Sequence, residues 1–174
     1  LDTDFYSDLA DTRLKRKNQG RTAICVPGAA AAWAVIYDPW ATKPLAALAA
    51  PAIIAAEDGF PIDKTLAIQI QGNFEKILQD SLLASLFLQD SLPLQEGDTL
   101  RQPDLAKTFR QLVDKNLRSF YRGTIAEAVV QASTSGSGFM ELSDLEFYRA
   151  EKTEPLITDF EGSLSGYTAL TVPP

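Results

Sequence analysis

The residue types that could do chemistry are unevenly represented in this sequence of 174 residues. Histidine is absent, which excludes a Ser-His-Asp triad, a Cys-His pair and every His-containing zinc site. Cys25 is the single cysteine, so no disulfide can form within the chain and cysteine pairing indicates no compartment. Because Cys25 lies in the apolar run 23–26, we expect a buried, unreactive thiol rather than a nucleophile.

The other motifs with a chemical meaning are incomplete. Carboxylates are numerous but scattered, and no pair has a spacing that favours acid/base catalysis. The glycine motif 136–138 lacks the Walker lysine and the strand-to-helix context of a nucleotide loop, so we interpret it as a flexible turn. Segment 2–11 contains several aspartates but not the pattern of a calcium-binding hand. The sequence therefore predicts no catalytic, cofactor-binding or metal-binding residue, and no cofactor.

Charge and hydropathy exclude two further classes of partner. With 16 basic and 23 acidic residues the formal charge is -7, which disfavours nucleic acid as a partner. One N-terminal cluster is basic, and we interpret it as a solvated loop rather than an anion site: Arg13, Lys15, Arg16, Lys17 and Arg21. The longest apolar run, 45–56, is shorter than the roughly 18 residues of a membrane helix, so no membrane span is expected. Any signal peptide would have been removed or would lie upstream of Leu1.

The elements of the first half are predicted to be mostly helical. Residues 1–25 are polar and aperiodic, as in a surface segment. The alanine-rich stretch 29–37 predicts a helix that ends at Asp38-Pro39. Residues 44–58 are apolar almost all round, which predicts a central buried helix with Gly59 as its C-terminal cap. Pro51 predicts a kink or a break in that helix.

Further helices are expected up to residue 148. Asp63 can cap a helix that runs to about residue 80, and a short helix is expected at 82–88. Pro103 suits the first position of an amphipathic helix with Leu105, Phe109, Leu112 and Val113 on one face. The sequences Thr-Ile-Ala-Glu at 124–127 and Ser-Asp-Leu-Glu at 143–146 predict capping boxes. We expect 29–148 to form a compact core that buries Ile70, Phe74, Phe109 and Leu112.

The C-terminal part has the pattern of a β-hairpin, with strands at 152–160 and 167–172. A lone hairpin is marginally stable in water, so we expect it to belong to a larger sheet. Its unpaired edges could also pair with a second copy, which predicts a possible hairpin-mediated homodimer. The fold class is therefore mainly α, with a polar surface segment at 1–25, a helical lobe at 26–150 and a hairpin at 151–174.

Several strings share an order and spacing with one known family. They are Val-Pro-Gly at 26–28, Pro-Ala-Ile-Ile-Ala-Ala-Glu-Asp-Gly-Phe-Pro-Ile at 51–62, Gln-Glu-Gly-Asp-Thr-Leu-Arg-Gln-Pro-Asp-Leu-Ala-Lys-Thr-Phe at 95–109, Phe-Tyr-Arg-Gly-Thr-Ile-Ala-Glu-Ala at 120–128, Met-Glu-Leu-Ser-Asp-Leu-Glu-Phe-Tyr at 140–148, and Gly-Tyr with Val-Pro-Pro within 166–174. Over almost its whole length the chain resembles the large subunit of the γ-glutamyltranspeptidases.

The resemblance implies an N-terminal-nucleophile hydrolase with an αββα parent fold, in which a precursor cuts itself and frees a threonine. That threonine, with its own α-amine as base, transfers a γ-glutamyl group from glutathione or a similar donor to water or an amino acid. The family's substrate-binding arginine is expected upstream of Leu1, and the rest of the large subunit and the whole small subunit downstream of Pro174. None of the family's functional residues falls on a position of this chain. The implied partners are those missing parts, and the implied location of the parent is periplasmic or extracellular.

Two departures from the family leave the substrate open. Alanines occupy 29–32, where the family usually has Thr-Val-Ala-Gly, and the loop at 161–166 is longer than usual. The parent could be a related amidohydrolase, such as a cephalosporin acylase or a poly-γ-glutamate depolymerase. A stand-alone, non-catalytic helical interaction module is the alternative from another class. A natural stop near Pro174 would indicate the module, and a longer frame with a cleavage site would indicate the enzyme.

Overall fold

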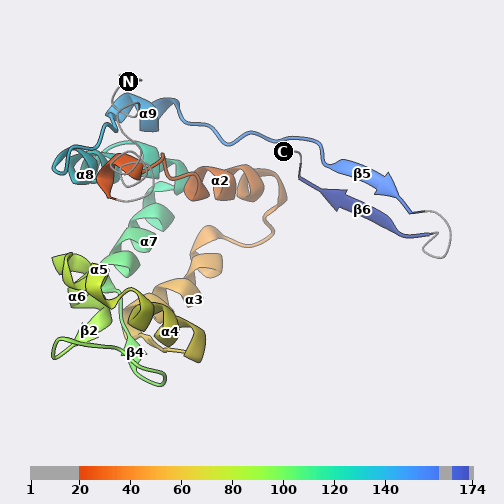
Figure 1. Cartoon of the computed structure of the whole chain (residues 1–174). Helices are drawn as coiled ribbons and strands as arrows, with labels where there is room; N and C mark the ends of the chain where they lie inside the picture. The colour runs from red at the N-terminus through yellow and green to blue at the C-terminus, as the bar shows by residue number, and fades with distance from the viewer. Residues whose placement is uncertain (1–19, 161–165, 173–174) are drawn as a thin grey trace, which may run out of the picture.

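The computed structural model of the chain describes residues 20–160 and 166–172, and helices dominate this part (Figure 1). The helices are η2 (Arg21–Ala23), α2 (Ala29–Trp40), α3 (Leu45–Asp58), α4 (Lys64–Gly72), α5 (Phe74–Leu78), α6 (Ser81–Phe87), α7 (Pro103–Lys115), η3 (Leu117–Tyr121), α8 (Thr124–Thr134) and α9 (Leu142–Phe147). The strands are β1 (Phe60–Pro61), β2 (Leu88–Gln89), β3 (Leu92–Pro93), β4 (Thr99–Leu100), β5 (Leu156–Asp159) and β6 (Thr168–Thr171). They pair antiparallel as β1–β4, β2–β3 and β5–β6. The expected mainly helical chain with small strand pairs is confirmed.

Buried side chains gather in three clusters rather than in one core. The Tyr121 cluster joins the start of α2 to η3, α8 and α9, and contains Ala30, Ala31, Tyr121, Ala126, Met140 and Leu145. The Leu112 cluster joins α2, α7 and η3, and contains Ala34, Leu112 and Leu117. The Ile62 cluster lies at the other end of the molecule, and contains Ile62, Ile70, Ile77, Leu94 and Leu100. Helices α3 and α7 pack along each other and connect the two ends (Figure 1).

The first two predicted helices exist, but their proline residues do not end or break them. Helix α2 continues through Pro39 to Trp40, and the N–H of Ala41 still donates to the carbonyl of Tyr37 at 3.0 Å. Helix α3 runs from Leu45 to Asp58 through Pro51, so the predicted break does not occur, whereas a kink at Pro51 stays a prediction. A proline removes one backbone donor, and a helix held by its other hydrogen bonds and by packing can continue past it.

The predicted burial of α3 is also wrong. Ala56 is its only buried residue, whereas Leu48 is 50% and Ile54 57% exposed. The reason is that α3 packs against α7 on one side, and an apolar composition does not determine which side that is. The expected cap is present, because the N–H of Gly59 donates to the carbonyl of Ala55 at 3.1 Å and Gly59 has a φ of +91°.

The helix expected from Asp63 to about residue 80 is divided in two. Asp63 caps α4 as predicted, since its carboxylate accepts the N–H of Leu66 at 2.7 Å. Asn73 then separates α4 from α5, and its side-chain amide donates to the carbonyl of Gln69 at 2.9 Å. A side chain that competes for helix carbonyls, next to the weak helix former Gly72, favours an interruption. Of the predicted core residues, Ile70 is buried and Phe74 is half-buried.

The later helix starts agree in position but not in capping chemistry. Pro103 is the first residue of α7, as predicted. Helix α8 is preceded by Gly123 with a φ of +71°, and the Thr124 hydroxyl accepts from the Gln111 side chain at 2.8 Å, so the first predicted capping box is wrong. The second lies two residues earlier than predicted, where the Asp144 carboxylate accepts the N–H of Glu141 at 2.8 Å.

The predicted C-terminal hairpin is confirmed and extends away from the helical body (Figure 1). Ile157 lies opposite Leu170, and both side chains are exposed. Residues 161–165 lie outside the described residues. The homodimer through this hairpin and the division at residues 25 and 150 stay predictions. Within the described ranges, no helix is long and apolar enough to cross a membrane.

Candidate functional site

The single cysteine is exposed, which corrects the predicted buried thiol. Residues 24–28 form a connection without regular structure between η2 and α2, and the neighbouring Val26 side chain packs against the Tyr121 cluster. Cys25 therefore lies on the outer side of this connection. In the part of the chain that the structure describes, no group of three or more His, Cys, Asp or Glu residues could hold a metal ion.

Arg21 is the described member of the N-terminal basic cluster, and residues 13–17 lie outside the described residues. Its guanidinium donates to the carbonyl of Ala132 and to the hydroxyl of Ser135, at the C-terminal end of α8. A cation is favoured at that end of a helix by the helix dipole. Arg21 therefore fastens the segment before α2 to the end of α8.

The glycine motif 136–138 forms the predicted turn directly after α8. The N–H groups of Gly136 and Gly138 donate to the carbonyl of Ser133 at 3.2 and 3.0 Å. A Cβ at Gly138 would lie 2.2 Å from the Ser133 hydroxyl oxygen, so the turn needs a glycine there. Its role is to fold the chain back over the end of α8.

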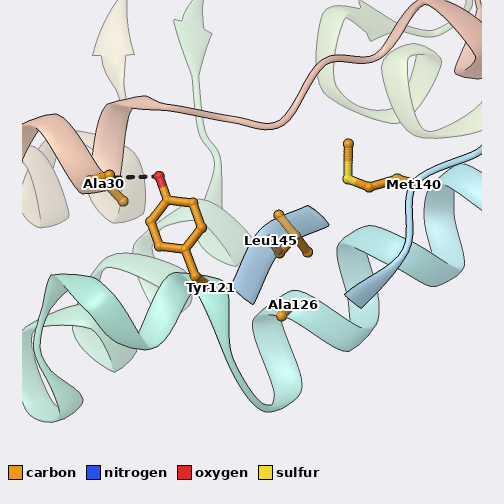
Figure 2. Packing of buried hydrophobic residues seen from close by; sticks show 6 residues of the cluster. Ala30, Tyr121, Ala126, Met140 and Leu145 are labelled. Atoms are coloured by element: carbon orange, nitrogen blue, oxygen red, sulfur yellow. Dashed lines mark hydrogen bonds between the residues drawn. The ribbon is translucent and has the colours of Figure 1, made fainter. Parts of the chain in front are cut away.

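Tyr121 connects segments that are far apart in the sequence (Figure 2). Its hydroxyl accepts the N–H of Ala31 at 3.0 Å and donates to the carbonyl of Pro27 at 2.6 Å. Its ring, only 7% exposed, stacks on Tyr148 with the ring centroids 5.6 Å apart. The hydroxyl thus satisfies one of the N–H groups that the first turn of α2 leaves without a helix partner.

Gly28 completes this junction because it leaves room for Tyr148. A Cβ at Gly28 would lie 2.4 Å from the Tyr148 hydroxyl oxygen. The strings at 26–28, 120–128 and 140–148 thus meet at one place, which we call the tyrosine junction. Sequence reasoning singled out the strings but not the role of the two tyrosines. The available signal was the repeated tripeptide Phe-Tyr-Arg, which occurs at 120–122 and again at 147–149.

The strings at 51–62 and 95–109 meet at a second place, the Gly59 junction. The N–H of Ile62 donates to the carbonyl of Asp98 at 2.8 Å, and the N–H of Gln102 donates to the carbonyl of Ala56 at 2.7 Å. A Cβ at Gly59 would lie 2.5 Å from Cγ2 of Thr99 and 2.9 Å from the backbone oxygen of Leu100. The segments that carry the family resemblance are therefore those that hold the helices in place.

A cavity of about 730 Å³ opens between α2, η3 and the segment 146–150, beside the tyrosine junction. Ala31, Ala34 and Val35 line one side of it. The lining also contains one carboxylate, that of Glu146, and four basic side chains, so we call it the basic cavity. The basic residues are Lys115, Arg118, Arg122 and Arg149.

A second, apolar groove of about 410 Å³ lies between α2, α3 and α7. Trp33, Trp40 and Leu48 line it and are about half exposed. Phe109 also lines this groove, which explains why it is half-buried rather than buried as predicted.

Replacing Tyr121 by phenylalanine is expected to reduce the free energy of unfolding by about 1–3 kcal/mol, because a buried backbone N–H and a part-buried carbonyl lose their partner. Burial raises the pKa of the Tyr121 hydroxyl above its ordinary value of 10.0, and nearby Tyr148 adds to the rise against the opposing hydrogen bond from Ala31. The folded state therefore keeps this proton at higher pH than the unfolded state, and stability falls as the pH rises above 10.

Urea titration between pH 7 and pH 11 measures both effects. Between pH 7 and pH 11, the free energy of unfolding of the Tyr121→Phe variant should fall less than that of the parent chain, because the variant lacks the Tyr121 proton. Tyr167→Phe, at an exposed tyrosine, is the matched control and should change neither quantity. A Tyr121→Phe variant as stable as the parent chain would show that the two hydrogen bonds contribute nothing net.

Comparison with known proteins connects these junctions to a family. The whole chain, residues 1–174, matches the model of the family described as Gamma-glutamyltranspeptidase. The chain belongs to the gamma-glutamyltranspeptidase family. It is 39% identical over 153 residues to a glutathione hydrolase proenzyme of Bacillus subtilis, an alignment that covers 88% of this chain and 25% of that protein. The chain thus spans about a quarter of the length of this curated relative.

Solved structures of the gamma-glutamyltranspeptidase family and its relatives have the same fold over this region. The Helicobacter pylori gamma-glutamyltranspeptidase superposes with a TM-score of 0.86 at 28% identity, covering 100% of this chain and 48% of that chain. A cephalosporin acylase from Bacillus halodurans superposes with a TM-score of 0.79 at 30% identity, covering 95% of this chain and 33% of that chain. Both similarities support the family membership that the sequence led us to expect.

Proposed function

We propose that this chain is part of a γ-glutamyl transferase/hydrolase and that it supports the active site structurally without supplying a catalytic residue. The observation that carries the proposal is the family match over residues 1–174, together with the two junctions that the matching strings build. In the proposed parent, an N-terminal threonine accepts the γ-glutamyl group of glutathione or a similar donor and passes it to water or an amino acid.

The catalytic chemistry is assigned to residues outside this chain for a chemical reason. An N-terminal threonine nucleophile needs a free α-amine as its base, and no histidine-based substitute is available in a sequence without histidine. Cys25 is exposed, and with no histidine in the chain it has no imidazole base to activate it. At the tyrosine junction, the Tyr121 hydroxyl is engaged by the backbone at Pro27 and Ala31.

The partners in this proposal are the remainder of the large subunit and the small subunit of the same precursor. The relative from Bacillus subtilis is named a proenzyme, which supports a precursor that is processed. A periplasmic or extracellular location of the parent is part of the same proposal. The β5–β6 hairpin, with its exposed apolar side chains, is the part of the chain proposed to join the central sheet of an αββα parent.

A second candidate is a parent that hydrolyses a different amide. The cephalosporin acylase is as similar in sequence as the Helicobacter pylori transpeptidase, so similarity within this chain does not separate the two substrates. A stand-alone helical interaction module is the third candidate. The length of the natural reading frame distinguishes it from the two enzymes.

The isolated chain is expected to release no nitroaniline from γ-glutamyl-p-nitroanilide. The longer protein encoded by the natural reading frame is expected to release it and to prefer this substrate to glutaryl-p-nitroanilide, which lacks the α-amine. A preference for the glutaryl compound would favour the second candidate. Activity of the isolated chain that survives repurification and disappears on mutation of one of its residues would contradict the proposed structural role.

A further inference from the structure

The basic cavity has the size and the charge of a ligand site. Its volume of about 730 Å³ falls within the roughly 300–1,000 Å³ of small-molecule pockets. Four cationic side chains and one carboxylate line it: Lys115, Arg118, Arg122, Arg149 and Glu146. The whole chain has a formal charge of -7, so the excess of cations here is opposite in sign to the rest of the molecule. Such a local field attracts anions.

The cations of the cavity are only weakly neutralised. Among the described residues, none forms an ion pair with Lys115. Arg122 pairs with Glu146 at 3.2 Å, and Arg118 pairs with Asp38 at 2.5 Å, but these side chains are more than half exposed. Exposed ion pairs contribute little to stability, so an incoming anion can compete for the arginines.

Arg149 is held in a fixed position at the rim. Its Nη1 donates to the carbonyls of Glu146 and Tyr148, each at 2.7 Å. Backbone carbonyls orient a guanidinium without cancelling its charge. Among the described residues, the rim therefore combines two cations without an ion-pair partner, Lys115 and the oriented Arg149, with two arginines in exposed pairs.

One side of the cavity, which we call its floor, is apolar. It consists of Ala31, Ala34 and Val35 on one face of α2, and α2 is fastened at its start by the hydroxyl of Tyr121. An ordered apolar floor below a cationic rim fits a ligand with charged groups and a small apolar body.

We propose that the basic cavity binds a small organic anion that carries at least two carboxylate or phosphate groups. Two anionic groups reduce the mutual repulsion of the rim cations, while the carbon skeleton contacts the floor formed by α2. The inference rests on the cavity alone and does not depend on γ-glutamyl transfer. Because the rim is exposed, binding should weaken as the Debye length falls from about 30 Å at 0.01 M salt to about 8 Å at 0.15 M.

The test is a titration of the full chain with citrate and, separately, with inorganic phosphate, followed by amide chemical shifts. We expect saturable shifts confined to the residues around the cavity, such as Ser119 and Gly123. Lys115→Gln should weaken citrate binding by about fivefold, the effect of one nearby charge in a solvated site. Lys64→Gln is the matched control, because Lys64 is an exposed lysine at the start of α4 and does not line the cavity. Inorganic phosphate carries a single anionic group, so tighter binding of citrate than of phosphate is the expected result for a site that takes two groups.

Three outcomes would overturn the proposal. The first is an absence of saturable binding at 0.01 M salt, and the second is equal weakening by both lysine variants. The third is binding of an acidic peptide without binding of citrate, which would assign the cavity to a polypeptide partner. Because Lys115 is exposed, its variant is expected to keep the fold, and an unchanged thermal unfolding midpoint verifies this.

Discussion

Replacing Gly59 by alanine should lower the free energy of unfolding by about 3–5 kcal/mol. Two costs add at this position. The φ of +91° and ψ of 168° at Gly59 form a backbone conformation that essentially only glycine adopts, which costs an L residue about 1–3 kcal/mol. A Cβ would also lie within 2.9 Å of the Leu100 backbone oxygen and 2.5 Å from Thr99, and forcing the junction apart costs a similar amount.

Two other glycines separate the contributions. Gly97 has a φ of +92° but open space around its Cβ position, so Gly97→Ala should show the backbone cost alone, about 1–2 kcal/mol. Gly72 is the last residue of α4, with neither a positive φ nor a close neighbour, so Gly72→Ala should be neutral or stabilising by up to about 1 kcal/mol. Urea unfolding of the three variants measures these differences. A Gly59→Ala variant no less stable than Gly97→Ala would show that β4 moves aside at no cost.

Replacing Leu145 by alanine should cost about 2–5 kcal/mol. Leu145 is 0% exposed and lies within the Tyr121 cluster, where removing its side chain leaves a cavity enclosed by α8, α9 and η3 (Figure 2). Packing on α8 and η3 holds the short helix α9 on the rest of the chain. Losing it should therefore also expose the segment that carries Tyr148.

The matched control is Leu142→Ala in the same helix. Leu142 is 49% exposed, so the same chemical change should cost less than about 1 kcal/mol. Both variants make the same chemical change within α9, so the difference between them measures mainly the burial of Leu145. Equal losses in the two variants would mean that α9 contributes through its helical backbone and not through Leu145.

Local patterns in the sequence were sufficient to locate most helices and the hairpin. Pro103 and Asp63 begin helices because a first-turn proline and an N-terminal carboxylate satisfy local requirements that no distant residue changes. The β-branched and aromatic residues on both sides of the glycine-containing loop 161–166 predicted the hairpin for a similar reason. Burial was less predictable, because α3 has apolar residues on every side and its packing partner α7 lies more than forty residues further along the chain.

The contacts of the site residues could not be predicted from local patterns. Tyr121 is 90 residues away from Ala31 in the sequence, and no periodicity encodes a hydrogen bond between them. The exposure of Cys25 also depends on a distant contact. Its neighbour Val26 packs against the Tyr121 cluster, which leaves Cys25 on the outer side of the connecting segment. The family resemblance marked the strings that meet at both junctions, but it did not indicate that they meet. Three of the cations of the basic cavity, Lys115, Arg118 and Arg122, lie within eight residues, but local sequence did not indicate that they meet Arg149 beside α2.

The separation of the buried residues into clusters has a consequence for the order in which the chain folds. All members of the Ile62 cluster come from one continuous stretch, residues 62–100, whereas the Tyr121 cluster joins residues 30 and 145 and encloses that stretch. Closing a long loop costs more conformational entropy than closing a short one. Once the Ile62 cluster has formed, it shortens the effective loop that the Tyr121 cluster must close. We therefore expect the Ile62 cluster to form first and to make the later closure of the Tyr121 cluster easier.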